Sequence, residues 1–266
     1  MKRRSRNAAT YGEWAPSPPL KEHLCCLWLN DRSHAPAAVF NVVPDGCVDV
    51  IWTQRDIIVA GPDTRPVAAE LPANAVLVGA RFHPGAALSW LGIPLNEILN
   101  SRLPLREFWK SDVSPLADAL SRLTDPAAIG HEIERTLVAR LSRLGPIPQS
   151  VAFLRDAAFR NLHDGHLNIP EIAGHMGLSE RTLQRRCTDV FGYGLKTLHR
   201  ILRFQRFRNL ALHSVDDRLV EIAFEAGYAD QAHLTREVRR LGGLTPAQYL
   251  ATLRDRSTTL DFASKE

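Results

Sequence analysis

The stretch EIAGHMGLSERTLQRRCTDVFGYG, residues 171–194, returns in altered form as EIAFEAGYADQAHLTREVRRLGG, residues 221–243. The two copies match at an offset of 50 for eight residues and, after one inserted residue, at an offset of 51. Each copy places a glycine, Gly177 or Gly227, between two stretches whose apolar residues have helical spacing. Glycine takes the left-handed backbone that ends a helix at low cost, so each copy predicts a helix-turn-helix unit.

Residues that cap helices stand where the two units need them. In the first copy Asn168 and Glu171 have capping-box spacing, and Ser179 precedes the second helix. In the second copy Asp217 and Asp230 are expected to cap the first and second helices. The buried stripe of each second helix is predicted to consist of Leu183, Cys187, Val190 and Phe191 in the first copy and of Leu234, Val238 and Leu241 in the second.

The opposite faces of these second helices carry side chains that can read base edges in duplex DNA. Arginine recognises guanine, glutamine recognises adenine, and threonine contacts a thymine methyl group or forms a hydrogen bond. The outer faces are predicted to hold Arg181, Thr182, Gln184 and Arg185 in the first copy and Gln231, Ala232, His233, Thr235 and Arg236 in the second. One such face could belong to an ordinary solvated helix, but two copies with matched caps, glycines and arginines favour DNA binding.

Between the two units, residues 195–210 predict one long helix with basic side chains, namely Lys196, Arg200, Arg203, Arg206 and Arg208. A rigid connecting helix would let the two recognition helices enter successive major grooves, about 34 Å apart, on one face of the DNA. We therefore predict that Lys196, Arg200 and Arg206 contact phosphates.

Composition places the chain among ordinary globular proteins, with 266 residues, 45% apolar and 23% charged, and a net charge of +4. No run of about 18 apolar residues predicts a transmembrane helix, and no apolar segment of a secretion signal follows the basic first residues. Four cysteines without a CxxC pair argue against a disulfide framework and favour the reducing cytoplasm. The basic excess lies in residues 146–256, with 16 Lys and Arg against 12 Asp and Glu, where a DNA-binding surface is expected.

The first 85 residues predict a different structure, built from short strands and tight turns. Apolar runs alternate there with turn residues, and they occupy positions 24–29, 38–43, 47–52, 57–61 and 75–82. This density of short strands favours a small antiparallel barrel or sandwich. Helical patterns begin after Gly85. We therefore expect an α+β chain, with a small antiparallel β-rich N-terminal domain that also carries helices and an all-α C-terminal domain with two helix-turn-helix units.

One long helix is predicted at the junction of the two halves. It begins at Asp125–Pro126, ends at Gly145–Pro146, and carries the apolar stripe Ile129, Ile133, Leu137, Leu141 and Leu144. The stripe could form a dimer interface or pack on the barrel of its own domain. We expect three regions, namely 11–110 as a sensor domain, 111–148 as a helical linker and candidate dimerisation helix, and 149–253 as the double helix-turn-helix domain.

Residues 150–253 resemble the DNA-binding domain of AraC-type (AraC/XylS) transcriptional regulators, which has seven helices and two helix-turn-helix units. The resemblance rests on Leu178–Arg185, Phe191–Gly194, Gly227–Leu234 and Leu244–Pro246. It implies base contacts by Arg181, Gln184, Arg185, Gln231, His233, Thr235 and Arg236, and Thr182 lies on the same face. The chain departs from the family in packing positions and in one phosphate-contacting position, namely at Cys187, Val238 and Leu250.

The N-terminal half is similar to an uncharacterised domain that precedes AraC-type domains in bacterial regulators. The similarity covers about residues 11–110 and rests on Trp14-x-Pro16, Val43–Asp49, Gly79–Gly85 and Leu91–Gly92. It implies a sensor or assembly role and names no ligand.

Four residues of this domain are candidates for a ligand pocket, namely Asp49, Trp52, Arg81 and His83. If their strands are neighbours, Asp49 and Arg81 could bind a polar ligand or form a structural ion pair, and we favour the ion pair. The histidines and cysteines lack zinc-site spacing, and the adjacent Cys25 and Cys26 are expected to be buried and inert. We expect no metal and no cofactor.

These patterns predict a non-enzymatic transcription regulator of the AraC type that binds double-stranded DNA, with a sensing or dimerising N-terminal domain. RNA polymerase, an unidentified effector and a second copy of the chain are candidate further partners, and no membrane is expected. The alternative is a bifunctional DNA alkylation-repair protein with a cysteine acceptor in the N-terminal domain. That alternative needs a zinc-held thiolate and several spaced cysteines, of which this domain offers three.

Overall fold

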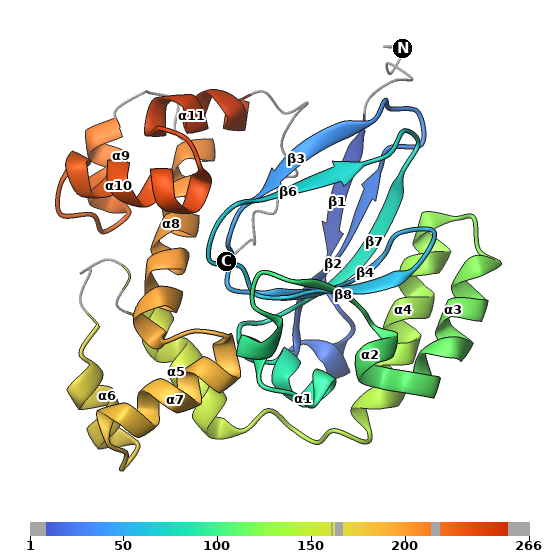
Figure 1. Ribbon diagram of the computed structural model, residues 1–266, viewed down its shortest axis with the longest axis horizontal. Helices are drawn as coiled ribbons and strands as arrows, with labels where there is room; N and C mark the ends of the chain where they lie inside the picture. Colours follow the sequence, from blue (N-terminus) through green and yellow to red (C-terminus); the bar gives the residue numbers. More distant parts are fainter. Residues whose placement is uncertain (1–8, 161, 163–166, 214–218, 255–266) are drawn as a thin grey trace.

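The computed structural model describes residues 9–160, 162, 167–213 and 219–254, which form a β-rich domain and a helical domain (Figure 1). A six-stranded antiparallel sheet with the order β1-β2-β7-β4-β5-β8 forms the centre of the first domain, and β3 and β6 form a separate ribbon. The strands are β1 Thr10–Trp14, β2 Leu24–Asp31, β3 Ala38–Val42, β4 Val48–Trp52, β5 Ile57–Ala60, β6 Val67–Leu71, β7 Val76–Phe82 and β8 Arg102–Pro104. The predicted α+β class is confirmed.

The sheet brings together chain segments that are distant in the sequence. Strand β7 pairs with β2 on one side and with β4 on the other, so that Leu24 and Val48 both lie opposite Phe82. A β-bulge interrupts β2 between Leu24 and Cys26. The first residues of β2 and β4 and the last residue of β7 therefore meet at one end of the sheet, beside the helical domain (Figure 1).

Helices cover one face of the sheet. They are α1 Ala87–Leu91, α2 Arg106–Trp109, α3 Ser114–Ser121 and α4 Pro126–Leu141, with short 3₁₀ helices at Pro18–Leu20, Leu95–Ile98 and Lys110–Val113. The carboxylate of Asp125 accepts hydrogen bonds from the amides of Ala127 and Ala128, as its capping position predicts. The predicted stripe of α4 packs into the core of its own domain, with Ile129, Ile133 and Leu137 buried there. This stripe is therefore not exposed for dimerisation, and α4 ends at Leu141, before Gly145.

The second domain is helical throughout the part that the structure describes. Its helices are α5 Gln149–Arg160, α6 Ile169–His175, α7 Glu180–Phe191, α8 Leu195–His213, α9 Leu219–Glu225, α10 Gln231–Gly242 and α11 Pro246–Arg254. The pairs α6–α7 and α9–α10 lie at opposite ends of α8 (Figure 1). With 19 residues, α8 is about 28 Å long at the usual rise per residue.

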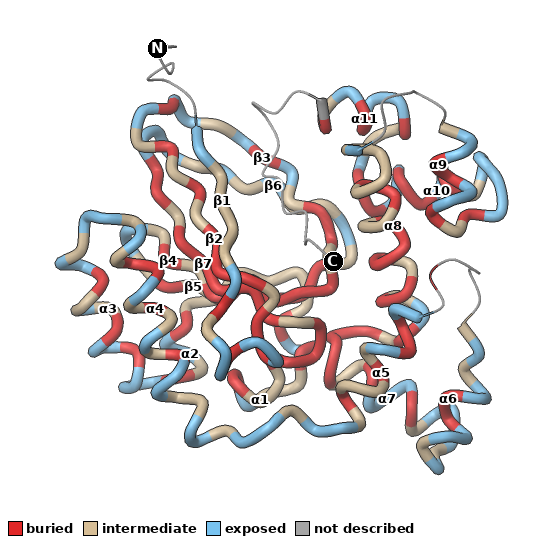
Figure 2. Tube along the Cα trace, turned by 180° about the vertical axis from the view of Figure 1, so that it is seen from behind, coloured by how far each residue is buried: buried red, intermediate tan, exposed pale blue. Residues whose placement is uncertain are grey.

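The two domains pack directly on each other. Val43, between β3 and β4, belongs to the core of the helical domain. The backbone passes Val190 and Phe191 so closely at Gly85 that an added Cβ would lie 2.8 and 2.9 Å from their side chains. Figure 2 shows buried chain along the inner strands, along α8 and where the two domains meet.

One loop of the β-rich domain reaches both helix-turn-helix units. The left-handed glycines that end α7 and α10, Gly192 and Gly243, have φ values of +85° and +76°. An added Cβ would lie 2.7 Å from Pro62 at Gly192 and 3.3 Å from Pro66 at Gly243. We call residues 61–66 the bracing loop. The Arg102–Asp63 ion pair, with an N–O distance of 2.6 Å, fastens this loop to β8.

Candidate nucleic-acid interface

The first helix-turn-helix unit has the local structure that its sequence predicts. The Asn168 side chain accepts a hydrogen bond from the Glu171 amide at 3.2 Å and caps α6. Gly177 makes the turn with a φ of +63°, and the Ser179 hydroxyl accepts a hydrogen bond from the Thr182 amide at the start of α7. The predicted inner stripe, from Leu183 to Phe191, is buried.

The outward face of α7 presents most of the predicted base-reading residues. Arg181, Gln184 and Arg185 are exposed. Thr182 is half-buried, and its hydroxyl is within hydrogen-bond distance, 2.9 Å, of the Ser179 hydroxyl. The Gln184 amide group lies over Gly194, where an added Cβ would be 2.3 Å from its nitrogen. Arg181 and Arg185 are therefore exposed to solvent, whereas Thr182 and Gln184 contact other residues of the same unit.

The second unit repeats this arrangement around α10. The Asp230 carboxylate caps α10 by accepting a hydrogen bond from the His233 amide at 2.6 Å. Gln231 and Arg236 are exposed, and Thr235 donates its hydroxyl hydrogen bond to the Gln231 carbonyl at 2.8 Å. The expected cap at Asp217 lies outside the described residues.

His233 differs from the other predicted base readers because it also packs inside the domain. Its ring meets the ring of Tyr228 edge-on, with centroids 5.3 Å apart. Partial burial lowers the pKa of His233, and the positive charge of Arg203 acts in the same direction. The side chain is therefore held neutral and positioned by Tyr228, with one part of its ring still accessible.

The connecting helix α8 uses its basic residues in three ways. Lys196 is exposed. Arg200 forms a two-pronged ion pair with Glu237 of α10, with N–O distances of 2.7 and 2.8 Å, and Glu237 is 8% exposed. Arg206 donates to the Glu225 carbonyl at 3.1 Å, and both Arg203 and Arg208 are buried. Much of the basic charge on α8 thus holds the domain together.

The four candidate pocket residues of the β-rich domain do not form one site. Asp49 and Arg81 line a cavity of about 270 Å³ between the sheet and the β3–β6 ribbon. His83 lines another cavity, of about 530 Å³, between the sheet and α8. Trp52 is 5% exposed and packs in the core of the sheet. Trp52 therefore contributes to the core and lines neither of these two cavities.

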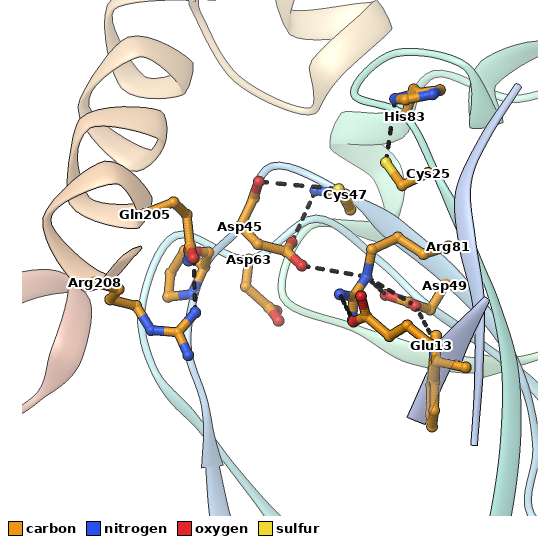
Figure 3. Close-up of polar contacts among 12 residues, drawn as sticks. Glu13, Cys25, Asp45, Cys47, Asp49, Asp63, Arg81, His83, Gln205 and Arg208 are labelled. Carbon is orange, nitrogen blue, oxygen red and sulfur yellow. Dashed lines mark hydrogen bonds and ion pairs between the residues drawn. The ribbon is translucent and has the colours of Figure 1, made fainter. Parts of the chain in front are cut away.

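Asp49 and Arg81 lie opposite each other on β4 and β7 and form the centre of a buried charge cluster (Figure 3). The Arg81 guanidinium lies 3.2 Å from Asp49, 3.5 Å from Asp45 and 3.8 Å from Glu13. Trp28 donates its indole hydrogen bond to Asp49 at 2.7 Å. Burial raises the pKa of the Asp49 carboxyl to about 6, although Arg81 acts in the opposite direction. The predicted ion pair therefore exists and also borders a cavity.

The sequence did not reveal a second polar cluster, formed by Cys25, Cys47 and His83. The Cys25 sulfur lies 3.1 Å from His83 Nδ1, and all three residues line the cavity of about 530 Å³. Cys25 is half-buried and hydrogen-bonded, so of the two adjacent cysteines expected to be buried only Cys26 is. The β-bulge and the shared partner strand β7 bring these residues together, and no spacing in the sequence signals either feature.

Two further observations bear on the classes considered above. Among the described residues, no three or more His, Cys, Asp and Glu side chains are arranged to hold a metal ion. None of the helices in the described ranges combines the length and the hydropathy that crossing a bilayer requires.

Comparisons with known proteins assign both halves of the chain. Residues 12–104 match a domain of unknown function, DUF6597, and residues 172–252 match a helix-turn-helix domain. An apo form of ToxT from Vibrio cholerae is 11% identical, with a TM-score of 0.46 over 86% of this chain and 97% of that one. The C-terminal domain of AraT, a response regulator from Geobacillus stearothermophilus, is 20% identical, with a TM-score of 0.36 over 43% of this chain and 91% of that one. The AraC-like activator CuxR is 17% identical, with a TM-score of 0.23 over 74% of this chain and 80% of that one.

The two family matches divide the chain where the structure changes from a sheet to helices. The second match contains α7, α8 and α10, with their caps and outward faces. The chain therefore contains a DUF6597 domain followed by a helix-turn-helix domain.

Proposed function

We propose that this chain regulates transcription by placing α7 and α10 in successive major grooves of one DNA duplex. The observation that carries the proposal is the pair of matched, capped helices at the two ends of α8, each with an exposed arginine at the equivalent position. Those arginines are Arg185 and Arg236. An arginine of this kind reads guanine with two hydrogen bonds.

The proposed contacts follow from where each side chain lies. We assign base contacts to Arg181, Thr182, Gln184, Arg185, Gln231, His233, Thr235 and Arg236. The exposed members of this set can turn toward a base without losing a partner, whereas Thr182 and Thr235 first exchange the hydrogen bonds that they make within the domain. We assign phosphate contacts to Lys196 and to Arg206, which also donates a hydrogen bond to the Glu225 carbonyl. Arg200 is paired with Glu237, so we assign it a structural role and no phosphate contact.

We also propose that the β-rich domain binds a small effector and thereby modulates the binding of DNA by the helical domain. Its contacts with the helical domain support this role, because the bracing loop touches Gly192 and Gly243 and Gln205 of α8 donates a hydrogen bond to the Pro44 carbonyl. The cavity of about 270 Å³ beside Arg81 is large enough for a small molecule. Selection of bound duplexes from a random DNA pool, repeated with candidate metabolites, tests both the DNA binding and its modulation.

Three variants test which residues read bases. Arg185→Ala should relax the base preference in one half-site and Arg236→Ala in the other, by about 1–3 kcal/mol of discrimination each. Lys196→Ala should weaken binding to all sequences about equally and lower the salt dependence by about one counterion. Binding to a library of single-base variants of the selected site measures these patterns. If Arg185→Ala and Arg236→Ala weaken every library member uniformly, α7 and α10 are not the reading helices.

A further inference from the structure

The turn at residues 44–47 joins the sheet to the connecting helix. The Pro44 carbonyl accepts a hydrogen bond from the Gln205 side chain of α8, and Gln205 in turn accepts one from Arg208 at 2.7 Å. Gly46 is buried against the helix, because an added Cβ would lie 3.0 Å from Leu198. The next residue in the chain is Cys47. A displacement of Cys47 would therefore be transmitted directly to the surface on which α8 rests.

Cys47 and Cys25 lie at the same end of the sheet, in or beside the two strands that flank β7. Leu24 and Val48, the neighbours of the two cysteines, both lie opposite Phe82 of β7, and the bulge in β2 falls at Cys25. Both cysteines line the same cavity, and the Cys47 sulfur lies 3.9 Å from the Asp45 carbonyl oxygen. Figure 3 shows Cys25 between Cys47 on one side and His83 on the other.

His83 is oriented toward Cys25 by its second ring nitrogen. Its Nδ1 lies 3.1 Å from the Cys25 sulfur, and its Nε2 lies 3.2 Å from the Lys21 carbonyl oxygen. A doubly protonated ring would donate a hydrogen bond to each of these acceptors. His83 is therefore placed both to stabilise a thiolate at Cys25 and to supply a proton beside it.

The four cysteines differ in their ionisation. Hydrogen bonding by Cys47 and by His83 lowers the pKa of Cys25 to about 5, against the opposing effect of burial. The hydrogen bond to the ionised Cys25 and burial raise the pKa of Cys47, so this partner keeps its proton. Burial raises the pKa of Cys26, and it raises the pKa of Cys187 to about 11. Thiolates react with peroxides and thiols do not, so Cys25 is the reactive member of the set.

The pair is also reachable. Cys25, Cys47 and His83 line the cavity of about 530 Å³ that Leu202 and Gln205 of α8 border from the other side. Cys187, in contrast, is completely buried in the core of the first helix-turn-helix unit. A small oxidant can therefore reach Cys25 without unfolding of the domain.

We propose that Cys25 and Cys47 form a peroxide-reactive thiol pair that closes to a disulfide and moves the 44–47 turn relative to α8. The Cys25 thiolate attacks the terminal oxygen of a hydroperoxide, the S–O bond forms as the O–O bond breaks, and the departing alkoxide or hydroxide takes the proton of His83. Once Cys25 is a neutral sulfenic acid, Cys47 no longer faces an ionised partner, and it loses its proton as it attacks the Cys25 sulfur. The S–S bond replaces the S–O bond, and the departing hydroxide takes the Cys47 proton and leaves as water. Two thiols and one hydroperoxide thus give one disulfide, one alcohol or water, and one water.

The disulfide changes the geometry of the turn. A disulfide holds its two sulfur atoms about 2.05 Å apart, much closer than two sulfur atoms that are not bonded, and it fixes the dihedral angle between them. Cys47 is the last residue of the turn whose carbonyl and glycine face α8. Closure of the disulfide therefore pulls the turn toward β2 and loosens its contacts with Gln205 and Leu198.

The chemical step can be tested on the full, reduced chain without DNA. After brief treatment with hydrogen peroxide, and in a parallel arm with tert-butyl hydroperoxide, non-reducing peptide mapping should find one cross-link, Cys25 to Cys47, that a dithiol reverses. Cys26→Ser and Cys187→Ser should form the same cross-link at the same rate. Cys47→Ser should stop at a sulfenic acid on Cys25 that dimedone traps, and Cys25→Ser should slow oxidation of Cys47 at least tenfold. Cross-links between other cysteines or between chains, or oxidation of Cys25 no faster than that of Cys187, would overturn the proposal.

The mechanical step has its own readout. Amide hydrogen exchange in the part of α8 from Leu198 to Arg206 should become several-fold faster in the oxidised chain and stay unchanged in peroxide-treated Cys25→Ser. Unchanged exchange in a chain with a mapped Cys25–Cys47 disulfide would refute the coupling to α8. An effect on DNA affinity rests on the proposed function, and a several-fold change on oxidation, absent in Cys25→Ser, is expected there. If neither form selects a DNA site, the proposed function fails while the mapped disulfide still decides the thiol chemistry.

Discussion

In the first helix-turn-helix unit, the last turn of α7 carries Phe191 and packs against Gly85 of the β-rich domain. In the second unit the equivalent position of α10 is Gly242, and the space beside it is filled by Tyr249 and Phe204 of the helical domain itself. The reading faces and caps of the two units correspond closely, whereas their supports do not. At this position the first unit is supported by the neighbouring domain and the second by Phe204 of α8 and Tyr249 of α11.

Removal of Phe191 should expose this difference most strongly. Phe191 is 1% exposed, and a Phe→Ala change in a core typically costs about 3–5 kcal/mol of unfolding free energy. Phe191→Ala should show this loss in urea unfolding. The matched control is Phe224→Ala in the second unit, where the side chain is 80% exposed and a change within about 0.5 kcal/mol is expected. Similar losses for the two variants would contradict the contrast drawn here.

The second unit should respond most to the loss of its ion pair. Arg200→Ala removes the ion-pair partner of the Glu237 carboxylate, which is nearly buried. We expect a loss of about 3 kcal/mol of unfolding free energy. This value is at the lower end for such pairs because the Arg200 side chain is 26% exposed. The residue of α7 equivalent to Glu237 is Arg186, which is exposed. Arg186→Ala should change the unfolding free energy by no more than about 0.5 kcal/mol. Equal effects at the two positions would mean that the ion pair does not distinguish the units.

Loss of a helix cap should destabilise the two units by similar amounts. Ser179→Ala and Asp230→Ala each remove a side-chain acceptor from the first turn of a recognition helix. Each change should cost about 1 kcal/mol of unfolding free energy. Helicity by circular dichroism and urea unfolding measure the effect, with Thr252→Ala near the end of α11 as a control outside both recognition helices. A large cost in one unit alone would show that the caps, too, have diverged.

The smallest predicted effect concerns α8, which the two units share. His199 is buried, its Nδ1 lies 3.1 Å from the Ala158 carbonyl, and its Nε2 has no hydrogen-bond partner among the described residues. Burial lowers the pKa of His199 below the value of about 6.5 in the unfolded chain, so the unfolded state binds the proton first as the pH falls. Stability should therefore decrease below about pH 6.5, and less so in His199→Gln.

Unfolding free energies of wild type and variant at pH 7.5 and pH 5.5 measure this difference. His23 and His233, whose pKa values are lowered by burial in the same direction, are present in both proteins and cancel. An equal or larger loss in His199→Gln would show that His199 is not the titrating group.

Local features could be predicted from the sequence because local chemistry determines them. The caps Asn168, Ser179 and Asp230 and the turn glycines were predicted in place, since each satisfies backbone groups a few residues away. The five apolar runs of the first domain all contain strands. Three further strands, β1, β6 and β8, were missed because none of them contains a fully buried residue.

Features that depend on distant pairing were not predictable in this way. The meeting of Cys25 with His83 needs the register of β2 on β7 and a bulge, neither of which leaves a spacing in the sequence. Arg200 of α8 was predicted to contact a phosphate, yet it pairs with Glu237. An arginine in a helical sequence looks the same whether its partner is a phosphate or a buried carboxylate 37 residues further along the chain.

The bracing loop holds the two helix-turn-helix units at a fixed distance from each other. One loop lies against the glycine that follows each of the two proposed recognition helices, with Pro62 at Gly192 and Pro66 at Gly243, so the separation of the two helices and their relative rotation are set together. Each base pair inserted between two half-sites rotates the second by about 34° and moves it by about 3.4 Å along the duplex. A chain braced in this way should tolerate base changes inside a half-site better than a change in the distance between half-sites. The DNA sites that it binds should therefore differ in base sequence far more than in the spacing of their half-sites.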